Sequence, residues 1–149
     1  MHIGVLHVTI VHFPIALSIA AVVADAVWLV GRKPWAKHAG LYCLIFAALS
    51  AIPVAITGDA QLEDMQSQSL SSEQSSLAET HEDLGIATLA VVLAAATFRV
   101  ATTSRGWLKG IPVYIYGAMM AGLLVLITLT GHWGGMLAFG RDYLQPLFQ

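Results

Sequence analysis

Residues 5–30 read VLHVTIVHFPIALSIAAVVADAVWLV, and this stretch decides the fold class. It holds one acidic residue and no Lys or Arg, over more than the roughly 20 residues that cross a bilayer. Three further apolar stretches follow at 38–57, 80–100 and 111–133. Of the 149 residues, 57% are hydrophobic and only 11% are charged, which is too few charges to cover a small soluble domain. The sequence therefore predicts an integral membrane protein with four transmembrane helices.

The distribution of charge predicts how these spans cross the membrane. Basic residues concentrate in the turns after spans one and three: Arg32, Lys33, Lys37, Arg99, Arg105 and Lys109. The segment 58–79 is acidic, contains no Lys or Arg, and is expected to be an outer loop. Under the positive-inside rule this loop and both termini face outward, which for a bacterial inner membrane is the periplasm. We expect one domain over 1–149, an all-α up-down four-helix bundle, whose two hairpins resemble each other in hydropathy only.

Several function classes find no support in the sequence. The first residues lack the basic segment of a cleavable signal, so residues 5–30 are expected to remain a span. Cys43 is the single cysteine, which excludes an internal disulfide and a Cys-based metal cluster. There is no phosphate-binding glycine loop, no nucleophile elbow and no basic patch for nucleic acid.

Four histidines from separate segments are predicted to lie near the outward face. His7 and His12 lie in span one, His81 begins span three, and His132 ends span four. Ionisable groups in a membrane mark functional sites or make hydrogen bonds between helices, and both interpretations stay open. Because His7 and His12 are five residues apart, they differ by about 140° in direction. They are therefore expected to bind two different ligands or sites. Alternatively, one of them binds a ligand and the other donates a hydrogen bond that supports it.

Glycines lie at the same edge of the predicted bundle. Gly85 follows His81 by one helical turn, and Gly131 and Gly134 flank His132. A flat macrocycle between helices needs faces without side chains, and neutral His is a common axial ligand of haem iron. This combination predicts one haem b, or two staggered ones, bound by the four histidines. The glycines would leave space for the macrocycle. Close packing of helices is the alternative use of the glycines.

A non-haem metal site is the rival prediction. His12, His81 and His132 could bind copper, iron or zinc, with Asp59 as a fourth ligand. Asp59 could instead orient a ligand histidine or cap a helix in the loop. Asp25 is the one acid deep in a span, and we interpret it as structural because no second acid or base is expected at its depth.

Four motifs together resemble the bacterial family called domain of unknown function 2231. They are His7-x4-His12-Phe13-Pro14-Ile15, Thr57-Gly58-Asp59, His81-Glu82-x-Leu84-Gly85 and Thr130-Gly131-His132-Trp133-Gly134-Gly135. The resemblance covers nearly the whole chain. Val8 stands where the family usually has Pro, and Phe139 stands where relatives often have His. Relatives are similar to domains found beside c-type cytochromes and Rieske-like proteins, which implies electron transfer at the outer face.

Three functions are consistent with these observations. The first is a b-type cytochrome-like subunit that relays electrons between quinone or other membrane subunits and a periplasmic c-type cytochrome or other redox protein. The acidic loop would then dock a basic partner. The second is a copper or iron site. The third is a structural subunit that anchors a respiratory or photosynthetic complex and uses its histidines for hydrogen bonds only.

Overall fold

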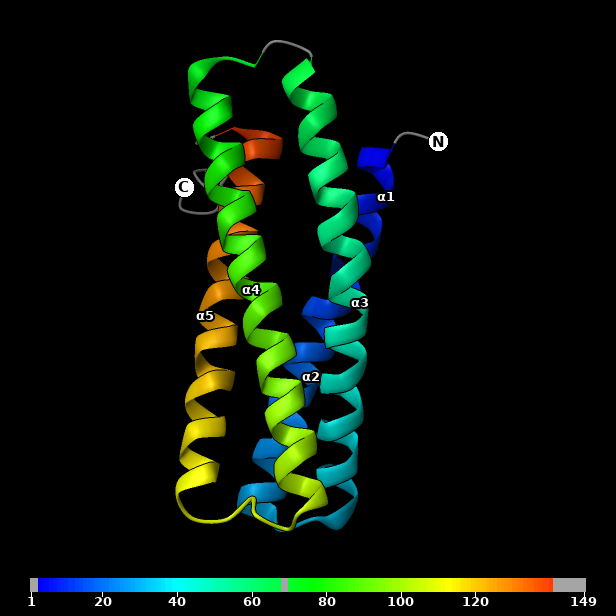
Figure 1. The fold of residues 1–149 in the computed structure, drawn as a ribbon, viewed down its shortest axis with the longest axis vertical. Helices are drawn as coiled ribbons and strands as arrows, with labels where there is room; N and C mark the ends of the chain where they lie inside the picture. Colours follow the sequence, from blue (N-terminus) through cyan, green and yellow to red (C-terminus); the bar gives the residue numbers. More distant parts are fainter. Residues whose placement is uncertain (1–2, 68–69, 141–149) are drawn as a thin grey trace, which may run out of the picture.

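A computed structural model describes residues 3–67 and 70–140 of the chain. It contains the helices α1 (Ile3–Ile10), α2 (His12–Gly31), α3 (Pro34–Ser67), α4 (Ser72–Ser104) and α5 (Ile111–Phe139) (Figure 1). In the described part of the chain, four helical segments are long and apolar enough to cross a membrane. α1 and α2 together form the first of them, Leu6–Gly31. Within the described ranges there is no strand, and the predicted all-α bundle of four spans is confirmed.

The first span is interrupted between α1 and α2 at Val11. Pro14 has no N–H, so it leaves the carbonyl of Ile10 without its helical partner and weakens the ladder at this point. Val11 nevertheless keeps helical angles (φ −59°, ψ −27°), and its N–H donates to the carbonyl of His7 at 3.0 Å. The chain therefore continues as one membrane-length segment from Leu6 to Gly31.

The spans pack as two hairpins that run in the same direction. In the first hairpin α2 packs along α3, and α1 packs on the far part of α3; in the second, α4 packs along α5. The hairpins meet mainly where α3 contacts α4. We call the end with the α2–α3 and α4–α5 turns the basic end. The opposite end, with α1, the α3–α4 turn and the last turns of α5, is the histidine end (Figure 1).

The structure differs from the predicted outer loop over 58–79. α3 continues to Ser67 and α4 begins at Ser72, so both helices extend past α1 at the histidine end (Figure 1). The start of α4 is fixed by a capping box, in which Ser71 accepts from the Gln74 N–H and the Gln74 side chain accepts from the Ser71 N–H. Leu77 is buried between the extensions. The acidic segment is therefore mostly a helical surface.

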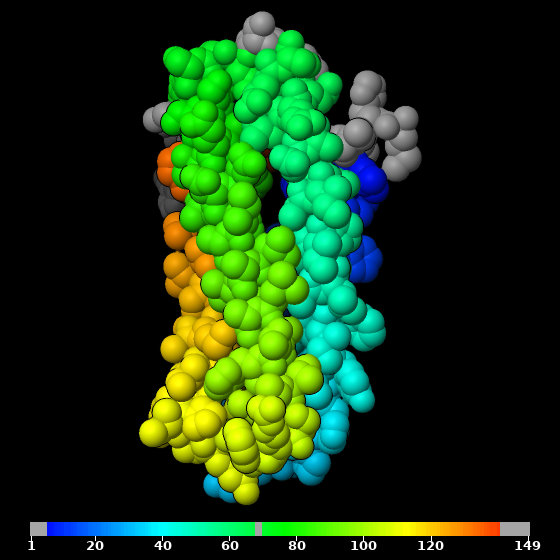
Figure 2. Space-filling view, in the orientation of Figure 1, coloured from blue at the N-terminus to red at the C-terminus, as the bar shows by residue number. Residues whose placement is uncertain are grey.

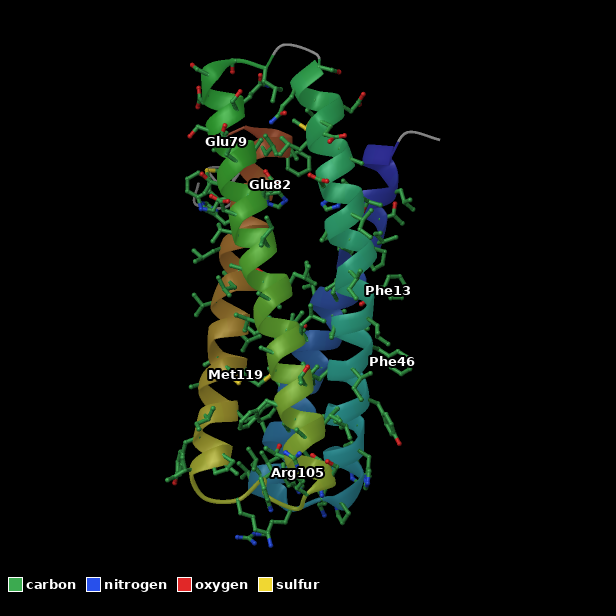
Figure 3. The ribbon with its side chains drawn as sticks, in the orientation of Figure 1. Phe13, Phe46, Glu79, Glu82, Arg105 and Met119 are labelled. Carbon is green, nitrogen blue, oxygen red and sulfur yellow. The ribbon has the colours of Figure 1, made fainter. Side chains whose placement is uncertain are left out.

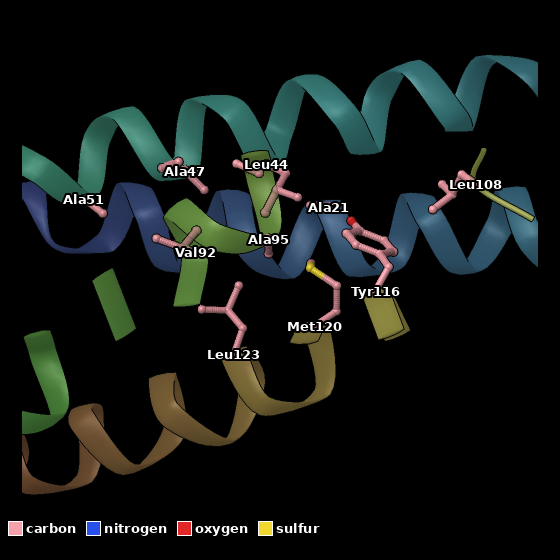
Figure 4. Packing of buried hydrophobic residues seen from close by; sticks show 12 residues of the cluster. Ala21, Leu44, Ala47, Ala51, Val92, Ala95, Leu108, Tyr116, Met120 and Leu123 are labelled. Atoms are coloured by element: carbon pink, nitrogen blue, oxygen red, sulfur yellow. The ribbon is translucent and has the colours of Figure 1, made fainter. Parts of the chain in front are cut away.

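The apolar core lies between the hairpins, nearer the basic end (Figure 4). Small side chains such as Ala21, Ala47 and Ala95 are fully buried there and allow close approach of the helices. The buried cluster ends at about the level of Ala51 and Leu123. Beyond it, toward the histidine end, Figure 2 shows a narrow opening between α3 and α4.

Large apolar side chains cover the outside of the bundle. Phe13 and Phe46 point away from the helices in Figure 3, and their residues are 64% and 58% exposed. A soluble protein rarely exposes apolar side chains along its whole length, whereas lipid tails are a suitable environment for them. The outer surface is thus suited to contact with the bilayer.

Candidate functional site

His7 lies in a recess that α3 provides. Its Nδ1 is 3.1 Å from the carbonyl oxygen of Val54 and 3.4 Å from the hydroxyl of Thr57. Because a carbonyl can only accept, Nδ1 is the protonated ring nitrogen. The ring edge lies against Gly58, where an added Cβ would be 3.0 Å from Cε1. The recess therefore consists of a backbone carbonyl and the glycine four residues after it, which we call a socket.

His81 lies in a second socket of the same design, provided by α5. Its Nδ1 is 3.0 Å from the carbonyl oxygen of Thr130. Four residues later, an added Cβ at Gly134 would be 2.8 Å from Cε1 of His81. Real Cβ atoms do not approach a neighbour this closely, so only glycine fits here without a shift. Each hairpin thus holds one histidine against its own second long helix.

The two histidines, which come from different hairpins, lie close to one another. Their ring centroids are 6.5 Å apart and their planes are perpendicular. With Nδ1 protonated, each neutral ring keeps a lone pair on Nε2, the form in which His binds metals. Among the residues that the structure describes, nothing hydrogen-bonds to either Nε2. The pair therefore offers two metal-binding nitrogens from different hairpins.

Other predicted site residues lie apart from this pair. His12 is exposed and bonds through Nδ1 to the carbonyl of Val8, four residues earlier in the same span, at 2.9 Å. His132 is exposed, with its ring 6.4 Å from that of Trp133, and Asp59 is also exposed. In 3–67 and 70–140, no three His, Cys, Asp or Glu residues come together as a metal site.

The predicted glycines also divide into two kinds. Gly134 packs against the ring of His81, whereas a Cβ at Gly85 or Gly131 would have no described atom within 4 Å. Gly58 has the same role beneath His7; the sequence placed it at the outer edge with the other glycines and in the motif Thr57-Gly58-Asp59, but did not predict it as a site residue. The sequence does carry a signal for Gly58, because Thr57 and Gly58 stand where the second apolar stretch ends.

The comparisons with known proteins agree with the membrane architecture. Residues 5–142 match a family model described as "Predicted membrane protein (DUF2231)". The chain belongs to the DUF2231 family. This confirms the family suggested by the four sequence motifs. No curated protein and no solved structure matches the DUF2231 chain, so its function is argued from the site.

A second polar cluster of the DUF2231 protein lies near the basic end, and the sequence did not predict it. Arg99 donates to the Asp25 carboxylate at 2.7 Å, and the Tyr116 hydroxyl donates to the same carboxylate at 2.5 Å. Arg99 is fully buried, and its guanidinium lies over the ring of Trp28, 4.6 Å from the ring centroid. It also donates to the backbone carbonyl of Lys37 at 3.4 Å. We call Asp25, Arg99 and Tyr116 the polar clamp; together with the bond from Arg99 to the Lys37 carbonyl it joins all four spans.

The clamp corrects two sequence interpretations. Arg99 was assigned to the turn after span three, but it lies inside α4. Asp25 was expected to have no charged partner at its depth, and Arg99 is that partner. Asp25 connects helices through an ion pair and a hydrogen bond, as a structural residue would, although the reason given for that interpretation was wrong.

Gly40 gives the clamp its room and provides a first prediction. A Cβ at this position would overlap the carboxylate of Asp25. Replacing Gly40 with alanine should therefore destabilise the DUF2231 bundle by about 1–3 kcal/mol, the usual cost of overpacking. Thermal unfolding followed by circular dichroism in detergent would measure it. Gly117→Ala is the matched control: no described atom lies within 4 Å of its added Cβ, and it should be neutral or slightly stabilising. Equal effects of the two variants would contradict the prediction.

Proposed function

We propose that this protein is a b-type cytochrome-like membrane subunit that transfers electrons, with one haem b held by His7 and His81. The observation that carries the proposal is the pair of imidazoles 6.5 Å apart, each fixed through Nδ1 on a backbone carbonyl. Two imidazoles that bind one metal from opposite sides have ring centres roughly 6 Å apart, because each metal–nitrogen bond is about 2 Å long. The observed separation fits this arrangement.

The number of protein ligands favours haem over a bare metal ion. Haem iron already has four ring nitrogens and takes one or two axial ligands from the protein. Copper, iron or zinc without a macrocycle is usually held by three or four protein ligands. The described part of the chain brings together two histidines and no larger set. The donor set is therefore sufficient for haem b and short for a bare ion.

The space around the pair supports the same choice. The buried apolar cluster ends before the histidine end is reached, and a narrow opening lies between α3 and α4 there (Figure 2). Gly85 and Gly131 present open space on α4 and α5 in this half. A flat group needs faces of this kind, without side chains, between the helices that hold it.

The chain's own residues would prepare the site for electron transfer. The iron supplies reversible one-electron chemistry when haem is bound. The Val54 and Thr130 carbonyls hold the Nδ1 protons of His7 and His81, which fixes the tautomer that leaves Nε2 free. Such hydrogen bonds also increase the basicity of a ligand histidine. The two histidines would therefore bind iron with little rearrangement of their rings.

Charge supports an outward-facing site with a basic redox partner. Acidic residues cover the α3 and α4 extensions at the histidine end: Asp59, Glu63, Asp64, Glu73, Glu79, Glu82 and Asp83 (Figure 3 labels two). Turns at the opposite end carry Arg32, Lys33, Arg105 and Lys109. By the positive-inside rule the histidine end would face the periplasm of a bacterial inner membrane. A basic c-type cytochrome would dock there, with electrons exchanged with quinone or another membrane subunit.

The test is a reduced-minus-oxidised absorption spectrum of detergent-purified protein made with ample haem supply, with a pyridine haemochrome assay. The proposal expects a sharp b-type α-band and about one haem per chain. Metal analysis of the same sample would report copper or iron outside haem. A preparation without Soret and α-bands would refute the cytochrome proposal. Bound copper or iron would then indicate a metal site, and its absence a structural subunit of a larger membrane complex.

A further inference from the structure

The first long segment of each hairpin carries its key residues at one spacing. Asp25 follows His7 by 18 residues, and Arg99 follows His81 by 18 residues. Eighteen residues make five helical turns, about 27 Å, so each pair lies on one face of its span. The histidines face each other at one end of this face, and the charges pair at the other. The two contacts between hairpins thus use equivalent positions.

The second long helix of each hairpin repeats its own spacing. Gly58 follows Gly40 by 18 residues in α3, and Gly134 follows Tyr116 by 18 in α5. Each of these positions contacts the matching residue of its own hairpin. Gly58 and Gly134 lie beneath the histidines; Gly40 adjoins Asp25, and the ring of Tyr116 lies under Arg99 with its centroid 5.2 Å from the guanidinium.

The core follows the same two shifts. A residue in the first segment of the first hairpin corresponds to the residue 74 positions later in the chain. A residue in the second helix of the first hairpin corresponds to the residue 76 positions later, as the clamp and socket residues show. Under these shifts Ala21 corresponds to Ala95 and Ala47 to Leu123, and all four are fully buried. The expectation that the hairpins share hydropathy only was therefore wrong. The repeat is carried by the inward-facing positions. It is hard to see in the sequence because unrelated lipid-facing residues lie between these positions.

We infer that the two hairpins are copies of one helical unit related by an approximate two-fold axis along the bundle, and that Gly58 and Gly134 are matched positioning residues that set the ring planes of His7 and His81 for one ligand shared between the copies. The axis follows from direction, since α2 and α4 run from the histidine end and α3 and α5 return. The identity of the ligand rests on the proposed function, whereas the sockets stand on the contacts above.

A methyl group in either socket should turn the ring. The added Cβ would lie 2.8 Å from the His81 ring in one case and 3.0 Å from the His7 ring in the other. The ring end can move, but only by weakening its Nδ1 bond to the carbonyl. Gly134→Ala should therefore act more strongly than Gly58→Ala. Gly117→Ala and Gly122→Ala, which lie in α5 outside the sockets and have open space at the added Cβ, are matched controls.

The orientation of the rings has a spectroscopic signature. Axial ligands set the electronic state of haem iron. Perpendicular imidazole planes keep the two π-type d orbitals of low-spin ferric iron nearly equal in energy, which gives a highly anisotropic electron paramagnetic resonance signal. We expect one such signal from the oxidised wild type. Each socket variant should keep its haem and show reduced anisotropy, while the controls keep the wild-type signal. Unchanged signals in both socket variants would overturn the inference.

A second measurement tests the sockets without haem. In ¹⁵N-histidine-labelled protein purified free of haem, His7 and His81 should show the Nδ1-protonated neutral tautomer, assigned with His7→Ala and His81→Ala. Gly58→Ala should shift only the His7 signal, and Gly134→Ala only that of His81. Nε2-protonated rings in the wild type would overturn the sockets. Correct tautomers in a protein that never binds haem would refute the proposed function and leave the sockets in place.

Discussion

Replacing either His7 or His81 with alanine should lower the haem content of the purified protein by more than tenfold. In the proposed site each residue would supply one nitrogen to the iron, and the two residues come from different hairpins. Even changes to residues that only support a ligand cost about 10–100-fold in metal affinity, so loss of the ligand itself should cost more. Haem per protein, measured by pyridine haemochrome and by the Soret absorbance, would report the loss.

The controls for these variants come from the same chain. His12 and His38 are exposed, and each bonds through Nδ1 to the carbonyl four residues earlier in the chain. Alanine at either position should leave haem content and the α-band unchanged. Circular dichroism should show equal helix content in all four variants, which separates loss of ligation from loss of folding. Retention of haem in His7→Ala together with its loss in His12→Ala would show that the assigned ligand is wrong.

Removing one partner of the polar clamp should have the largest effect on stability. Arg99→Met leaves the Asp25 carboxylate buried with Tyr116 as its remaining donor. Breaking a buried ion pair in this way costs about 3–5 kcal/mol, because the remaining charge is neither hydrated nor compensated. Denaturant unfolding in detergent micelles, followed by circular dichroism, would measure the change in free energy.

A double variant distinguishes the lost charge from lost packing. Asp25→Asn combined with Arg99→Met removes both charges and should recover most of the stability lost in Arg99→Met. Arg105→Met, in the exposed turn at the basic end, should change stability by less than about 0.5 kcal/mol. If Arg99→Met were as mild as Arg105→Met, the clamp would not stabilise the bundle.

Hydropathy was sufficient to predict the four spans, because the cost of exposing the backbone in lipid leaves few alternatives to helices. It could not predict the helical extensions at the histidine end. Their Ser- and Gln-rich sequence is typical of a loop, yet the Ser71–Gln74 capping box and the buried Leu77 stabilise helix there. A capping box is a local signal, and it was present in the sequence.

The site itself was only partly predictable. Histidines in apolar stretches stand out, so His7 and His81 were found, but so were His12 and His132, which lie apart from them. The sockets use backbone carbonyls, which every residue has, and only their glycines leave a mark in the sequence. Arg99 was missed because it ends an apolar run and resembles the first residue of a turn. Its partner Asp25 is 74 residues away, beyond any local pattern.

The clamp places opposite charges at equivalent positions of the two hairpins, and this governs which hairpin recognises which. Two first hairpins brought together in the same way would oppose carboxylate to carboxylate, and two second hairpins guanidinium to guanidinium. Like charges facing each other in a low-dielectric interior repel strongly, so self-assembly of either hairpin is disfavoured while the mixed pair is favoured. The opposite charges at this pair of inward positions therefore favour pairing of the first hairpin with the second over pairing of either hairpin with a copy of itself.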